Sequence, residues 1–221
     1  MSQTNDSEKF GDFSQYDRAK KDLYEVCTKI LEFPREREYE RHFLLAAIRR
    51  TLSLEVAFRH SIDVSNGQMA MTLVRLNLDT LARFYILYWA EETEGMTAET
   101  FAQEVAEGKE IRKMRFRGAK EKATDRWLIQ QIEGLANWIP NVYDRTSGAI
   151  HFSEFHIKQL LQQAKPIRRR EDGSLHVKLP IGPCENDADP ELYRELKQAF
   201  LHISLMLIVG LQHRSELALG S

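Results

Sequence analysis

Apolar residues recur at spacings of three and four along most of the chain, a pattern typical of amphipathic helices. The first such stripe, within residues 14–32, ends before Pro34 and consists of Leu23, Val26, Cys27 and Ile30. A second, over residues 38–62, is interrupted by Ser65-Asn66-Gly67 and consists of Leu44, Ile48, Leu52 and Val56. A third, over residues 68–92, consists of Val74, Leu78, Leu81, Tyr85 and Tyr88. This third segment is strongly apolar, so we expect it at the centre of a bundle.

The second half of the chain predicts shorter helices and one β-hairpin. Helices are expected from Thr97, over 127–138, over 140–161 and, long and apolar, over 191–216. Residues 168–181 alternate around Glu-Asp-Gly-Ser, which favours a hairpin. Because βαβ alternation and repeats are absent, we predict an all-α fold. It is a single domain over residues 1–221, a bundle of six or seven helices with a small β-hairpin insertion within 165–183 and a polar tail at 1–13.

Composition excludes some classes of function. The 31 basic and 33 acidic residues give a net charge of −2, so no general basic coat favours polyanions. Cys27 and Cys184 are too few for a disulfide framework and form no C-x-x-C pair. The first ten residues lack the features of a secretory signal, and no apolar run reaches membrane-spanning length. We therefore expect a cytoplasmic protein that has no membrane segment, metal or cofactor.

Positive charge is nevertheless concentrated locally. Residues 109–126 contain eight basic and three acidic side chains, and a second basic cluster lies around the predicted hairpin. Such clusters can bind the RNA backbone without reading its sequence. The candidate RNA-binding residues are Arg112, Lys113, Arg115, Arg117, Arg168, Arg169 and Arg170. Phe116, between two of these arginines, could stack on a base. The alternative interpretation is a solvated loop and helix face.

The segment from Tyr143 to His156 contains the most informative motif. Arg145 and His151 enclose five residues, an arrangement that resembles the Arg-x(4–6)-His motif of the HEPN superfamily of all-α proteins. This resemblance implies metal-independent RNA cleavage in a cleft between two protomers, hence a homodimer, in toxin, antiviral-defence or RNA-processing settings. The imidazole of His151 would act as general acid or base, and Arg145 would stabilise the phosphate.

The spacing alone does not identify the site, because five Arg–His pairs in the chain satisfy it. Arg35 and Arg37 pair with His42, and Arg169 and Arg170 pair with His176. The first set lies in a charged run at a helix start, and the second lies in the predicted hairpin. Only the pair formed by Arg145 and His151 has the placement that the family motif has, late in an all-α chain.

A second pattern overlaps the first. Tyr143, Ser147 and His151 recur every four residues, with Ser153 two residues on, which is similar to uncharacterised HEPN-like families. In these families an earlier apolar helix carries an Arg and an acid one turn apart. That resemblance assigns supporting roles here to Arg75 and Asp79, with Arg83 one turn further on.

The two patterns conflict on an unbroken helix. There, Arg145 and His151 would be separated by about 120° around the axis and by about 9 Å along it. A helix break near Gly148, or Arg145 from a second copy, would resolve the conflict. The residue after Arg145 is Thr146, where the family commonly has Asn, Asp or His.

Two functional hypotheses follow. The first is an RNA-binding protein that cleaves RNA with His151 and Arg145. The second is a catalytically inactive bundle of the same lineage that acts by binding a protein partner. In the second case His151 is a partly buried imidazole bonded to Ser147 or Asp79, and the charges of Arg75 and Asp79 form a structural network.

Overall fold

The computed structural model describes residues 10–169, 173–179, 181–185 and 188–220. Its elements follow one another as α1 (Ser14–Leu31), α2 (Glu38–Asp63), α3 (Gly67–Phe84), α4 (Ile86–Glu91), α5 (Ala98–Ala106), α6 (Asp125–Ile132), α7 (Ile139–Ser147), α8 (Glu154–Gln162), β1 (Lys165–Arg169), β2 (Leu175–Lys178) and α9 (Pro190–Leu219). The expected all-α bundle with a small β-hairpin is confirmed.

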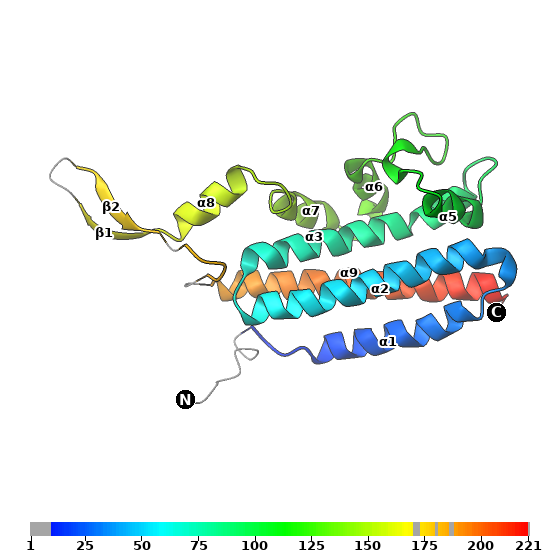
Figure 1. Ribbon diagram of the computed structural model, residues 1–221, viewed down its shortest axis with the longest axis horizontal. Coiled ribbons are helices and arrows are strands. Elements are labelled where there is room, and N and C mark those ends of the chain that lie inside the picture. The colour runs from blue at the N-terminus through cyan, green and yellow to red at the C-terminus, as the bar shows by residue number, and fades with distance from the viewer. Residues whose placement is uncertain (1–9, 170–172, 180, 186–187, 221) are drawn as a thin grey trace.

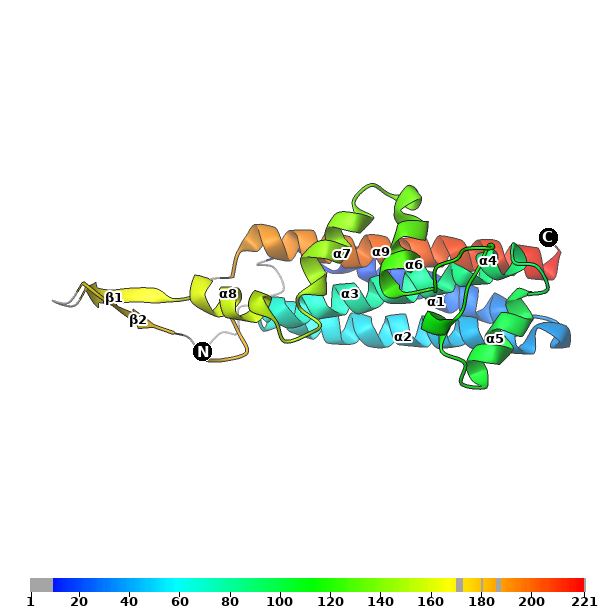
Figure 2. The same ribbon diagram turned by 90° about the horizontal axis from the view of Figure 1, so that it is seen from above.

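Four long helices form the body of the molecule. α1, α2, α3 and α9 run side by side, as Figures 1 and 2 show. α5 packs on α2 and α4, while α6 and α7 lie along α3. Local signals mark several of the helix starts: the Asn66 side chain accepts from Met69 N–H at α3, and that of Asp189 accepts from Glu191 N–H at α9.

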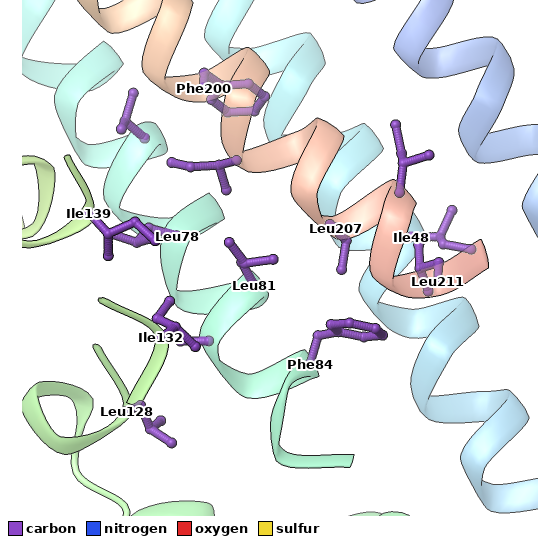
Figure 3. Close-up of a cluster of buried hydrophobic side chains, with 14 of the residues drawn as sticks. Ile48, Leu78, Leu81, Phe84, Leu128, Ile132, Ile139, Phe200, Leu207 and Leu211 are labelled. Carbon is purple, nitrogen blue, oxygen red and sulfur yellow. The ribbon is translucent and has the colours of Figure 1, made fainter. Parts of the chain in front are cut away.

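The core is centred on α3, as its apolar sequence predicts. Figure 3 shows three of its side chains, Leu78, Leu81 and Phe84, between those of α9 and those of the α6–α7 region. All three are fully buried. Full burial of each such side chain contributes about 1.5–3 kcal/mol, so this helix organises the layers packed around it. Those layers contribute the neighbours Phe200, Leu207, Leu211, Leu128, Ile132 and Ile139.

One detail of each of the helices predicted over 38–62 and 68–92 is wrong. Val56, placed on the inner stripe of α2, is 62% exposed, and Glu55 and Phe58 are buried instead. The helix expected over 68–92 is divided at Tyr85, where Tyr88 N–H bonds to Tyr85 O at a spacing of three residues. α2 is buried on more than one side, against α1, α3 and α5, so a single stripe does not describe it.

α8 and the hairpin form an arm that extends past one end of the bundle (Figures 1 and 2). The two strands pair antiparallel with each other, and every described residue of β1 is exposed. The segment expected as a polar tail at 1–13 contacts the bundle through Phe10. This residue is buried and stacks on Tyr193, with ring centroids 4.3 Å apart.

Candidate nucleic-acid interface and catalytic loop

The single helix predicted over residues 140–161 does not form. α7 ends at Ser147 and α8 begins at Glu154, with an irregular loop between them. Ser153 stabilises the start of α8, because its N–H donates to His156 Nδ1 and its hydroxyl donates to Gly148 O. A Cβ atom on Gly148 would lie 2.9 Å from Phe155 Cβ, so this close return of the chain depends on glycine.

His151 lies in this loop and is exposed to solvent. The predicted stripe of Tyr143, Ser147 and His151 is therefore wrong, since only the first two share a helix. The hydroxyl of Ser147 donates to Tyr143 O at 2.5 Å, within its own helix. Neither Ser147 nor Ser153 bonds to His151 within the described residues, so the imidazole is accessible to a ligand.

Arg145 is placed on α7 with its guanidinium directed to another partner. Its Nη1 lies 2.8 Å from Glu195 Oε2 on α9, and both side chains are about half exposed. Across the described ranges, no hydrogen bond or ion pair joins Arg145 to His151. One chain alone therefore leaves these two groups unconnected, and the positive charge of Arg145 is offset by a carboxylate.

Arg75 and Asp79 belong to a charge network that binds three helices together. Arg75 Nη1 lies 3.8 Å from Asp79 Oδ1, and its Nη2 lies 3.6 Å from Asp125 Oδ2 on α6. Arg83 pairs with Asp79 and lies 2.9 Å from Asp125. The buried guanidinium of Arg75 also lies over the ring of Tyr143, 4.4 Å from its centroid. These contacts join α3, α6 and α7.

The same face of α3 also contacts the loop. Thr72 Oγ1 donates to Ala149 O at 3.1 Å, two residues before His151. The network therefore acts as a support that holds α7 and the start of the loop on α3, rather than as a set of groups in contact with the imidazole. Asp125, which completes it, is missing from the sequence prediction because its partners are about 40–50 residues away.

The four candidate RNA-binding residues in the run at 109–126 are engaged by other groups after folding. Arg112 pairs with Glu110 at 2.6 Å, Lys113 pairs with the same carboxylate, and Arg117 pairs with Glu92 at 2.6 Å. Arg115 Nε donates to Lys120 O at 3.0 Å. Phe116 is fully buried, against Phe101 and Trp127, and so cannot stack on a base.

The hairpin cations are in a different situation. Arg168 and Arg169 are exposed on β1, and no ion pair involves either one within the described part of the chain. Arg170 lies outside the described residues. Among the candidate RNA-binding residues, Arg168 and Arg169 on the arm thus retain charges that folding has not matched within the described residues, as do Lys120, Lys122 and Arg126 elsewhere in the run at 109–126.

A hollow of about 340 Å³ lies where α8 faces the α2–α3 turn and the start of α9, and sequence patterns do not predict it. Its walls include His156, Gln159, Cys184, Glu185 and Asp189. Burial raises the pKa of Glu185, although a hydrogen bond from Tyr193 opposes the shift. Cys184 is exposed. No three His, Cys, Asp or Glu side chains gather as a metal site in the part of the chain described here.

Comparisons with protein-family models, curated proteins and solved structures found no match to this chain. Within the described ranges, no helix combines the length and apolar character needed to cross a bilayer.

Proposed function

We propose that the protein binds RNA and cleaves it without a metal ion, with His151 as general acid or base. The observation that carries this proposal is the exposure of His151 in the loop between α7 and α8. The arm that follows this loop carries exposed cations without an ion pair among the described residues. An exposed imidazole can take a proton from a ribose 2′-hydroxyl or donate one to a leaving oxygen. The HEPN resemblance of the Arg145–His151 segment supports the same reaction.

Stabilisation of the phosphate requires a cation near the imidazole, and Arg145 is the candidate. In a single chain it is held by Glu195, 2.8 Å away. We propose that cleavage takes place in a homodimer, in which Arg145 of one copy faces His151 of the other. A cytoplasmic role in antiviral defence or as a toxin would suit such an enzyme.

Cleavage of labelled RNA in EDTA tests the proposal. The His151→Ala variant should lose activity, and His42→Ala is the matched control because His42 is also exposed and also follows an arginine at the motif spacing. Glu195→Gln should increase cleavage, because it releases Arg145. An inactive wild-type protein, or equal activity in the two histidine variants, would contradict the catalytic role of His151.

A second candidate function is association with a protein partner without catalysis. The engagement of Arg145 by Glu195 favours it, as do apolar side chains left exposed on α8 and in the loop before it. These are Phe152, Ile157, Leu160 and Leu161. This alternative would be supported if the protein neither binds nor cleaves RNA and if it binds a protein partner that the Ile157→Ser variant no longer binds.

A further inference from the structure

We infer that the β1–β2 ribbon binds the phosphate backbone of nucleic acid through one of its two faces. The inference deepens the proposed function, on which it rests, by assigning RNA contact to defined residues. It starts from the pairing of the strands, in which Lys165 is opposite Lys178 and Arg168 is opposite His176. Residues paired across an antiparallel ladder lie on the same face, and residues alternate between the faces along each strand.

The pairing places four basic residues on one face. Lys178 and His176 are two apart on β2, so they share a face, and their partners Lys165 and Arg168 share it with them. Regular alternation would put Lys165 and Arg168, three residues apart, on opposite faces. The register shift between Pro166 and Arg168 accounts for their common face. We call this set the basic face of the ribbon.

The opposite face has a different composition. It carries the pairs Pro166–Val177 and Arg169–Leu175. A membrane-binding ribbon would need a continuous apolar face, but here Arg169 lies among the apolar residues of this face. The segregation of charge therefore favours a polyanion on the basic face over insertion into a lipid surface.

The basic face is not explained by folding. No acidic side chain pairs with Arg168 or Lys178 anywhere in the described residues. Arg168 and Lys178 therefore present positive charge to solvent from neighbouring strands on one face. A phosphodiester backbone supplies a complementary row of negative charge.

The position of the ribbon relates it to the candidate catalytic loop. α8 leads directly from the loop that holds His151 to β1, and the three segments follow one another along the arm (Figure 1). At helix and strand rises, α8 is about 13 Å long and β1 about 17 Å. Nucleic acid that lies along both would extend over on the order of ten nucleotides, at about 3.4 Å each.

Phosphate contacts predict a specific signature. Each one lost should reduce the slope of log affinity against log salt by about 0.7 for a single strand or about 0.9 for a duplex. The reduction should be the same for RNA and DNA of one sequence, because their phosphates are alike. Affinity should also fall once the oligonucleotide is shorter than on the order of ten nucleotides.

The test measures fluorescence anisotropy of labelled RNA and DNA between about 50 and about 200 mM salt. Arg168→Gln and Lys178→Gln should each reduce the salt slope. Arg169→Gln is the matched control, because it removes the same charge from the neighbouring residue on the opposite face. Circular dichroism spectra equal to that of the wild type would exclude misfolding as the cause.

The outcomes separate the two proposals. A wild-type protein that does not bind RNA would overturn the proposed function and this inference with it. A wild-type protein that binds RNA, with Arg168→Gln and Lys178→Gln both unchanged, would overturn the ribbon contact alone. Binding to anionic vesicles that depends on Arg168, without any such dependence for RNA, would identify lipid as the ligand and overturn the inference.

Discussion

Arg214 provides the most direct test of how the bundle is held together. Its side chain is fully buried in α9, and its Nε donates to Glu40 Oε1 of α2 at 2.9 Å. Its Nη2 also donates to Glu40 Oε1 and, at 3.0 Å, to Glu91 of α4, and the guanidinium lies 5.2 Å from the ring centroid of Tyr88. Replacement by Met would leave the buried carboxylate of Glu40 with one remaining partner, Arg37, at 3.0 Å.

Removing one member of a buried ion pair costs about 3–5 kcal/mol, because the other charge stays buried and uncompensated. Arg37 is about a third exposed and retains its contact with Glu40, so we expect the lower end, about 3 kcal/mol, for Arg214→Met. Against a stability of about 5–15 kcal/mol for a domain, this loss is easily measured. Urea denaturation followed by circular dichroism gives the free energy of unfolding.

Two further variants make the measurement specific. Glu91→Gln removes the negative charge of a carboxylate that is 41% exposed and should cost at most about 1 kcal/mol. The double variant Arg214→Met with Glu40→Leu removes both buried charges and should recover most of the loss, because apolar residues often replace a buried pair without cost. A loss below about 1 kcal/mol for Arg214→Met, or no recovery in the double variant, would refute the reasoning.

Two other predictions concern packing and pH. Gly210→Ala should destabilise the protein by about 1–2 kcal/mol in urea denaturation. The new Cβ would lie 2.4 Å from Phe84 Cε1, and this overpacking outweighs the gain in helix propensity. Gly134→Ala is the control and should be neutral, because the space around its Cβ is open. Burial raises the pKa of Glu185, so its contribution to stability is complete below the unfolded-state pKa and is lost as pH rises through the folded-state pKa. Glu185→Gln should therefore gain stability relative to the wild type as pH rises to neutrality, in thermal denaturation at several pH values, and an advantage that is constant with pH would contradict this.

The long helices could be predicted because their signals are local. Pro34 and the Ser65-Asn66-Gly67 turn bound α2, and apolar spacing locates its neighbours within a few residues. The break after α7 has local signals too: Gly148, and Ser153 three residues before His156. Periodicity across this region outweighed them in the sequence prediction, because a capping histidine is less typical than Glu or Gln at that position.

The partners of the candidate site residues could not be predicted in this way. Glu195 lies 50 residues from Arg145, and Asp125 lies 50 residues from Arg75; both contacts depend on which helices become neighbours. The sequence therefore identifies residues with suitable chemistry, but it does not show whether each of them already pairs with another side chain. That distinction changes the interpretation of Arg145, whose charge is matched within its own chain.

The two basic segments show why this distinction matters for function. In sequence, residues 109–126 have the stronger charge asymmetry and are the better RNA-binding candidate. After folding, Arg112 and Lys113 share Glu110 and Arg117 pairs with Glu92, so contact of these three cations with a phosphate would first have to break existing ion pairs. Arg168 and Lys178 have no such competitor among the described residues. Since polyanion affinity arises from release of counterions by unpaired cations, Arg168 and Lys178 are stronger candidates in the folded protein than Arg112, Lys113 and Arg117.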